Sequence, residues 1–150
     1  MMATGSVTAT PIPRHAPPRA AVYYPDSDGK PMAETDLHRD IMLDVIFMLQ
    51  RWFAGQSDDV YVSGNILVYY VEGDPRRSVS PDALVIKGVR QYRRDVVKLW
   101  EEGRAPQVVF EVTSSSTRRE DTGRKRLLYA QLGVREYYMY DPTGDYLDPR

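Results

Sequence analysis

The sequence contains no cysteine and only two histidines, His15 and His38, among its 150 residues. The absence of cysteine excludes disulfide bonds and thiolate zinc sites. Two histidines are too few for a histidine-cluster metal site, and they make a serine–histidine–aspartate catalytic site improbable. Any metal or acid–base chemistry in this chain is therefore expected to depend on carboxylates.

Long apolar runs and a strong net charge are also missing. No run approaches the roughly 18 apolar residues of a membrane span, and the N-terminus lacks the basic and apolar regions of a signal peptide. The default expectation is a cytoplasmic protein with no membrane partner. The net charge of −1 gives no overall basic signal for nucleic acid, and 42% hydrophobic residues suffice for one domain with a core.

The N-terminal part divides into an arm and a helix. Residues 1–21 are rich in proline, threonine and alanine without any period, which predicts a disordered arm before a single domain over residues 22–150. Apolar residues at helical spacing predict a helix from about Thr35 to Ala54. Glu34 at its start is either a carboxylate that favours the helix dipole, with an exposed His38 beside it, or a third acidic group of a metal site.

Two apolar strands each carry a carboxylate at one end. Glu111 interrupts the buried run Val108-Val109-Phe110, and Asp82 opens the apolar stretch that ends at Ile86. A carboxylate at the end of a core strand is costly unless it is paired or holds a metal. Two such strands predict a site for a hard cation such as Mg²⁺ or Mn²⁺, which prefers oxygen ligands.

A second helix is expected to begin at Thr117, where Thr117 and Glu120 have the spacing of a capping box, and to end at Gly133. Lys125 lies on its inward stripe and has two interpretations. It either extends to solvent from the rim of the core or reaches the two carboxylates with its ammonium group. The full stripe comprises Asp121, Lys125, Leu128 and Leu132.

The order of elements predicts a mixed α/β architecture. A helix, three or four strands with turns, a helix and a strand indicate a mixed sheet with helices on its faces. The residues after the turn at Asp141-Pro142 are expected to begin one more strand. Between the Asp82 and Glu111 strands, basic residues alternate with aromatic ones, which suits either a solvated loop or contact with phosphates. These basic residues include Arg90, Arg93 and Arg94.

Three segments together resemble a known family, the Uma-type restriction endonucleases of the PD-(D/E)XK nuclease superfamily. They are SPDALVIKG, VVFEVTSSSTRREDTGRK and LGVREYYMYDP. The resemblance extends from about Pro31 to Pro142 and implies a restriction-endonuclease-like core, a central mixed sheet flanked by helices. Members of the family continue with further strands after the Asp-Pro turn, so the resemblance also predicts that this sequence is a version shortened at its C-terminus.

The resemblance assigns roles to individual residues. It implies that Asp82 and Glu111 are the acidic catalytic residues and the ligands of Mg²⁺ or Mn²⁺, and that Glu34 loosely matches a further acidic residue. The superfamily places a lysine two residues after the second acidic one, where this sequence has Thr113. Lys125 matches the place to which this family moves the lysine.

The implied reaction is hydrolysis of phosphodiester bonds in DNA with Mg²⁺ or Mn²⁺ and no organic cofactor. Arg118 and Arg119 join the three earlier arginines as candidate phosphate contacts. A homodimer is compatible with the sequence. A module that kept the fold without the chemistry, binding nucleic acid or another partner, is the main alternative. A metal-dependent phosphatase acting on a small nucleotide would share the same residues but needs a closed pocket.

Overall fold

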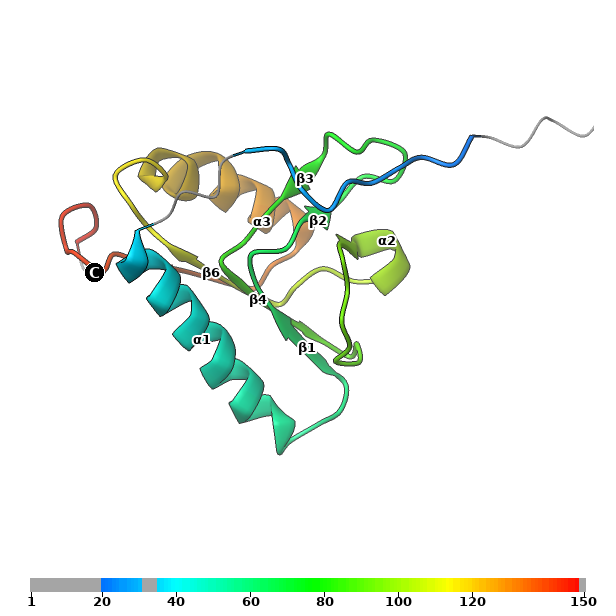
Figure 1. Ribbon diagram of the computed structural model, residues 1–150, viewed down its shortest axis with the longest axis horizontal. Coiled ribbons are helices and arrows are strands. Elements are labelled where there is room, and N and C mark those ends of the chain that lie inside the picture. Colours follow the sequence, from blue (N-terminus) through cyan, green and yellow to red (C-terminus); the bar gives the residue numbers. More distant parts are fainter. Residues whose placement is uncertain (1–19, 31–34, 149–150) are drawn as a thin grey trace, which may run out of the picture.

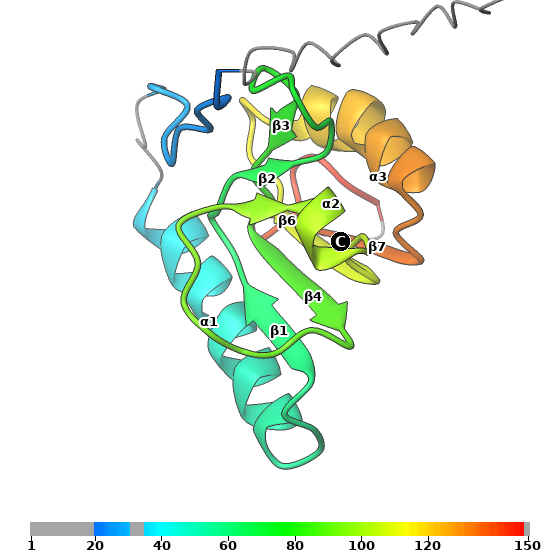
Figure 2. The ribbon, with the colours of Figure 1, turned by 90° about the vertical axis from the view of Figure 1, so that its right-hand side faces the viewer.

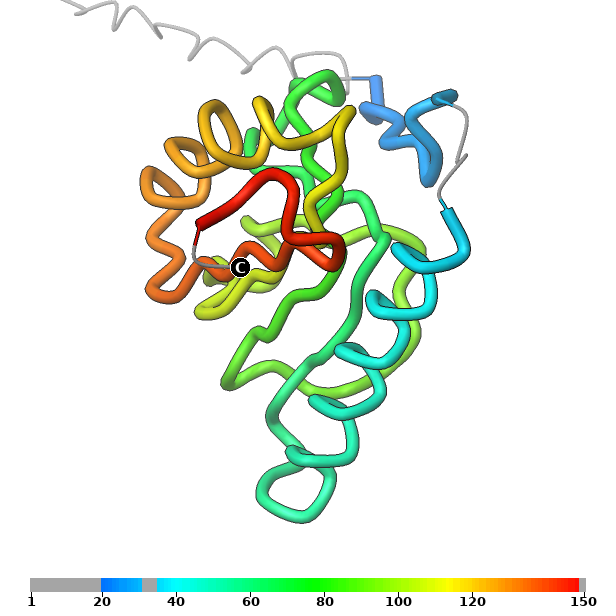
Figure 3. Tube along the Cα trace, turned by 90° about the vertical axis from the view of Figure 1, so that its left-hand side faces the viewer, coloured from blue at the N-terminus to red at the C-terminus, as the bar shows by residue number. Residues whose placement is uncertain are grey.

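A computed structural model describes residues 20–30 and 35–148 of the chain (Figure 1). A four-stranded sheet with strand order β1-β4-β6-β7 forms its centre, and a three-stranded sheet with order β3-β2-β5 lies beside it. The long helix α1 and the helical segment before β7 cover opposite faces of the larger sheet (Figures 1 and 3). This arrangement confirms the expected mixed sheet with flanking helices and adds the smaller sheet.

The larger sheet is mixed. β1 (Val60–Ser63) pairs antiparallel with β4 (Ala83–Lys87), β4 pairs antiparallel with β6 (Val108–Val112), and β6 pairs parallel with β7 (Glu136–Tyr140). The residues Ala83 to Ile86 of β4 are all buried, because β4 is covered on both faces. That burial explains the unbroken apolar run in this part of the sequence.

Helix α1 (Asp36–Ala54) matches the predicted range closely. The Thr35 side chain caps it by accepting a hydrogen bond from the backbone N–H of His38. Leu49 and Phe53 near its C-terminal end pack against a buried cluster of β1 and β4 that consists of Val60, Val62 and Val85. The N-terminal end of α1 therefore lies near the other end of the sheet (Figure 2).

The smaller sheet completes the second face of the core. It consists of β2 (Val68–Tyr69), β3 (Ser78–Val79) and β5 (Val97–Lys98), and the short helix α2 (Leu99–Glu102) follows β5 directly. Val68, Val79 and Val97 from this sheet share one buried cluster with Leu84 and Val109 of the larger sheet. The residues between Asp82 and Glu111 thus form an ordered strand and helix as well as a loop.

The second helix spans residues 118–132, close to the predicted range from Thr117 to Gly133, but its geometry and its cap differ from the prediction. A π-helical segment, η1 (Glu120–Lys125), leads into α3 (Arg126–Leu132), which ends at Gly133 in the left-handed conformation. The Thr117 hydroxyl accepts a hydrogen bond from the backbone N–H of Ser114, which lies outside the helix. The predicted capping box is therefore wrong: Thr117 closes the turn after β6.

Two expectations concern the ends of the chain. The predicted N-terminal arm, residues 1–21, lies outside the described residues except for its last two positions. Residues 141–148 form a turn organised by the Asp141 carboxylate, and the expected additional strand is absent from this described stretch. In the part of the chain that the structure describes, no helix is long and apolar enough to cross a membrane.

Candidate active site

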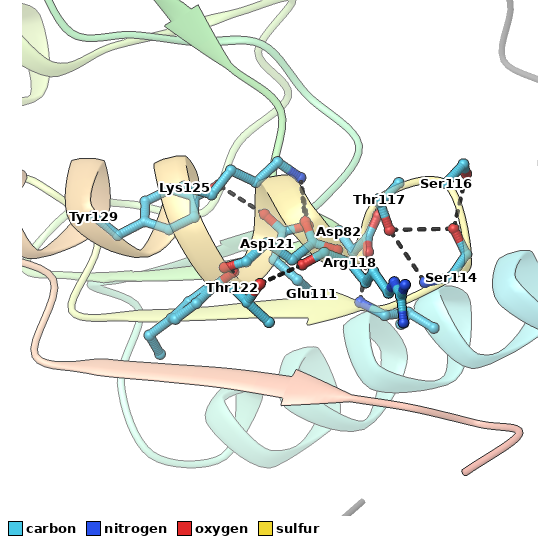
Figure 4. A network of polar contacts seen from close by, with 12 residues as sticks. Asp82, Glu111, Ser114, Ser116, Thr117, Arg118, Asp121, Thr122, Lys125 and Tyr129 are labelled. Carbon is cyan, nitrogen blue, oxygen red and sulfur yellow. Dashed lines mark hydrogen bonds and ion pairs between the residues drawn. The ribbon is translucent and has the colours of Figure 1, made fainter. Parts of the chain in front are cut away.

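The register of the central strands brings the two predicted carboxylates together. Ala83 of β4 lies opposite Phe110 of β6, so Asp82, just before β4, neighbours Glu111 near the end of β6. Gly64 permits this arrangement, because a Cβ atom at position 64 would overlap the backbone carbonyl oxygen of Asp82. The expected meeting of one carboxylate from each strand at the same sheet end is thus a feature of the fold (Figure 4).

Both oxygens of the Asp82 carboxylate have a polar partner. Oδ2 accepts a hydrogen bond of 2.7 Å from the backbone N–H of Val112, and Oδ1 lies 3.2 Å from Nε2 of His38. His38 is 7% exposed, so the interpretation of His38 as an exposed residue beside Glu34 is wrong. The packing of α1 against the sheet buries the imidazole over the end of β4. Glu34 itself lies outside the described residues.

The Glu111 carboxylate also has one donor on each oxygen. Lys125 Nζ donates to Oε2 at 3.0 Å, and the Tyr129 hydroxyl donates to Oε1 at 2.8 Å. The ammonium of Lys125 therefore points at the carboxylates rather than to solvent, which decides between its two interpretations. Thr113, where the superfamily carries its lysine, is buried and uncharged.

Asp121 is a third acidic group of the site. Its side chain is buried, and its Oδ1 lies 3.1 Å from Lys125 Nζ without hydrogen-bond geometry. Asp121, Lys125 and Tyr129 are spaced four residues apart. In an α-helix a four-residue step overshoots one turn by about 40°. In the wider π segment, the four residues from Asp121 to Lys125 cover slightly less than one turn. This shortfall compensates for the overshoot between Lys125 and Tyr129, so all three residues lie on the side facing β6.

The site carries more negative than positive charge. Burial raises the pKa of Glu111 to about 8 against the opposing effect of Lys125, and the charges of Asp82 and Asp121 raise it further. Burial alone would lower the pKa of Lys125, but Glu111 and Asp121 outweigh burial and raise it. Lys125 therefore stays protonated, while Glu111 retains a proton near neutral pH in the metal-free protein.

The donor set fits a divalent cation. Once Glu111 is ionised, three carboxylates and one ammonium leave a formal excess of two negative charges when His38 is neutral, and a divalent cation would balance them. Within residues 20–30 and 35–148, no three acidic or histidine side chains form a ready-made metal cluster. Mg²⁺ nevertheless needs only one or two carboxylates, because it keeps several waters. Asp82 and Glu111 meet that requirement.

The raised pKa of Glu111 predicts an unusual dependence of stability on pH. The unfolded chain releases the Glu111 proton near pH 4.5, whereas the folded protein holds it up to about pH 8. The folded state binds more protons in this window, so the free energy of unfolding should fall by roughly 4 kcal/mol between pH 5 and pH 8 in EDTA. Urea denaturation at several pH values measures this fall. Glu111→Gln should remove most of the slope, and an equally steep slope in that variant would contradict the assignment.

The site opens into a cavity of about 490 Å³. The loop residues Ser114 to Thr117 and the segment from Asp26 to Lys30 form part of its wall, together with His38. Arg118 and Arg119 are exposed directly after that loop. The Arg118 guanidinium lies over the ring of Tyr146, 5.6 Å from its centroid.

The other basic residues lie elsewhere. Three arginines follow the C-terminal end of β4, and this end lies about 17 Å along the strand from Asp82. They are Arg90, Arg93 and Arg94. The Arg94 side chain is 4% exposed, is paired with Glu102 at 2.6 Å and lies between two tyrosine rings. The Arg94 guanidinium is therefore occupied by contacts within the protein. This burial does not suit the interpretation of Arg94 as a phosphate contact.

Three residues of the site were not singled out as functional from the sequence. His38 was expected to be an exposed residue near the start of the first helix. Asp121 was expected on the inward face of the second helix without a role of its own, and Tyr129 was not expected on that face. The four-residue spacing of Asp121, Lys125 and Tyr129 was the available signal. It was hidden because regular α-helical geometry places Leu128, rather than Tyr129, in line with Asp121 and Lys125.

Comparisons with known proteins agree with this fold. A solved structure described as a putative nuclease belonging to DUF820 from Anabaena variabilis superposes with a TM-score of 0.56 at 17% sequence identity. The match covers 76% of this chain and 61% of that chain, so this chain spans less than two thirds of its length. At this identity the likeness shows the fold alone. No curated protein matches the chain.

Comparison with protein families identifies the family of this chain. The model of the Uma2 family, described as "Putative restriction endonuclease", matches residues 12–148. That range contains both β4 and β6 and the whole helical segment that supplies Lys125. The match spans most of the chain, and the chain therefore belongs to the Uma2 family of restriction-endonuclease-like proteins.

Proposed function

We propose that this protein is a metal-dependent endonuclease that hydrolyses phosphodiester bonds in DNA. One observation carries the proposal: Asp82 and Glu111 meet at the ends of adjacent strands, and the Lys125 ammonium contacts Glu111 in the same cavity. Membership of a family described as nucleases and the nuclease-like fold support the reaction class. DNA as substrate and Mg²⁺ or Mn²⁺ as the ion belong to the proposal.

Asp82 and Glu111 would hold the ion. A bound Mg²⁺ or Mn²⁺ would supply Lewis-acid polarisation of a phosphoryl oxygen and a water of lowered pKa. Val112 and His38 fix the orientation of the Asp82 carboxylate, and Tyr129 and Lys125 fix that of Glu111. The chain thus presents two oriented carboxylates without movement of the backbone.

Lys125 would act on the substrate itself. Its ammonium carries three N–H groups, donates one of them to Glu111 and lies 3.1 Å from Asp121, which leaves at least one N–H for another partner. That donor can bind a phosphoryl oxygen or the attacking water and stabilise the negative charge that develops in the transition state. The hydroxyls of Ser114 to Ser116 and the exposed Arg118 and Arg119 would contact neighbouring phosphates at the cavity mouth.

A cleavage assay tests the proposal. Supercoiled plasmid and labelled oligonucleotides are incubated with the wild type in Mg²⁺, in Mn²⁺ or in EDTA, and with Asp82→Asn in Mg²⁺. Cleavage is expected only for the wild type with metal. Asparagine is preferred to alanine because its side-chain oxygen still accepts from the Val112 N–H. Cleavage that persists in EDTA would contradict a metal mechanism, and DNA binding without cleavage would indicate an inactive nuclease-fold module.

A further inference from the structure

The two donors on Glu111 differ in how firmly their positions are set. Lys125 carries its ammonium on a flexible four-carbon stem and shares that group with Asp121. Tyr129 instead presents a hydroxyl on a rigid ring, and this hydroxyl donates to Glu111 Oε1 at 2.8 Å. We propose that Tyr129 is a positioning residue that fixes the Glu111 carboxylate for metal binding, an inference that rests on the proposed function.

The core holds the Tyr129 ring in place. Tyr129 is 2% exposed and belongs to the same buried cluster as Leu84 and Val109 of the central strands. The ring of Tyr137, from β7, packs against it with the ring centroids 5.2 Å apart. Because hydrophobic packing fixes the ring, the position of the hydroxyl is set before any ion binds.

The hydrogen bond orients Glu111 without blocking it. The Tyr129 hydroxyl has one proton, and in this contact it donates that proton to Oε1 of Glu111 at 2.8 Å. A carboxylate has about four lone-pair sites, and the hydroxyl occupies only one of those on Oε1. Lys125 occupies one site on Oε2, so about two sites stay available to a cation. Partners of this kind on metal ligands typically contribute 10- to 100-fold to metal affinity or activity.

A pair of tyrosine variants tests the inference. Tyr129→Phe removes the hydroxyl that donates to the Glu111 carboxylate. Tyr137→Phe removes a hydroxyl that donates to the backbone carbonyl of Asp121 at 2.9 Å. Both variants lose one hydrogen bond in the same layer of the core. Mn²⁺ binding is measured by isothermal titration calorimetry without DNA, and cleavage is measured at several Mn²⁺ and DNA concentrations.

Tyr129→Phe should raise the Kd for Mn²⁺ by about 10- to 100-fold, with Tyr137→Phe close to the wild type. The KM for DNA should stay unchanged in Tyr129→Phe, and excess Mn²⁺ should restore much of its kcat. Wild-type Mn²⁺ affinity in Tyr129→Phe, or an equal loss in Tyr137→Phe, would overturn the positioning role alone. A wild type that neither binds Mn²⁺ nor cleaves DNA would overturn the proposed function and this inference with it.

A second measurement keeps the ring and the hydroxyl, in case Tyr129→Phe fails to fold. The chain is labelled with 3-fluorotyrosine at position 129 or at position 137, and ¹⁹F spectra are recorded during a Mg²⁺ titration. The resonance at position 129 should shift with saturation, because its hydroxyl bonds directly to the Glu111 carboxylate. The resonance at position 137 should shift much less. A static signal at position 129 in a protein that binds Mg²⁺ would refute the role of Tyr129.

Discussion

Lys125→Met should slow metal-supported DNA cleavage by a hundredfold or more. The variant keeps the apolar stem but loses the ammonium that contacts Glu111 and Asp121 at 3.0 and 3.1 Å. Loss of one preorganised donor to the developing charge typically removes about 2 to 4 kcal/mol of transition-state stabilisation. DNA affinity should change little, because many phosphate contacts together supply the electrostatic part of the binding free energy and one of them is a small share. Single-turnover cleavage and filter binding measure the two effects.

The Lys125 variant also needs a stability measurement. Without the ammonium, the buried Asp121 carboxylate loses its cation, and breaking a buried pair costs about 3 to 5 kcal/mol. Cleavage rates are therefore normalised to the folded fraction. Lys98→Met is the matched control, because Lys98 pairs with Glu101 at the same 3.0 Å but lies at the surface of the smaller sheet. A wild-type cleavage rate in Lys125→Met would remove Lys125 from the proposed mechanism.

Glu111→Gln should abolish cleavage while preserving the fold. The amide has nearly the same shape and can still accept the Tyr129 hydroxyl hydrogen bond, but it is a much weaker ligand for Mg²⁺ than a carboxylate. Because burial makes the ionised Glu111 unfavourable, the neutral amide should leave the free energy of unfolding at pH 8 unchanged or higher. Plasmid cleavage and urea denaturation in EDTA give the two readouts.

Glu102→Gln is the opposite case and serves as the control. Glu102 forms a bidentate pair with the buried Arg94 at 2.6 and 3.1 Å, remote from the cavity. Its replacement should lower stability and leave the cleavage rate per folded molecule unchanged. If Glu111→Gln instead lost stability and retained cleavage, Glu111 would be a structural residue and the active-site assignment would be wrong.

Much of the candidate site followed from local patterns. Asp82 and Glu111 were found because each interrupts or opens an apolar strand, and a strand's two-residue period places its side chains without knowledge of the neighbours. The bounds of α1 followed from helical periodicity and the cap at Thr35. The expectation that Lys125 reaches the carboxylates followed from the short loop between β6 and the next helical segment, although the family resemblance was needed to favour it.

Other features depended on contacts between distant parts of the chain. His38 is buried because α1 crosses the end of β4, and Arg94 is buried because it stacks on Tyr61 of β1 and pairs with Glu102 of α2. Each of these side chains is compatible with an exposed position when its own segment is considered alone. The prediction of their environment failed for that reason.

By itself, the sequence determined which strands carry carboxylates, where α1 begins and ends, and the absence of cysteine chemistry. The tertiary structure decided which polar groups meet those carboxylates. Periodicity fixes the side of an element on which a residue lies, but not the element that packs against that side. The π segment adds a change of helical pitch that α-helical periodicity does not anticipate, and this change brings Tyr129 rather than Leu128 onto Glu111.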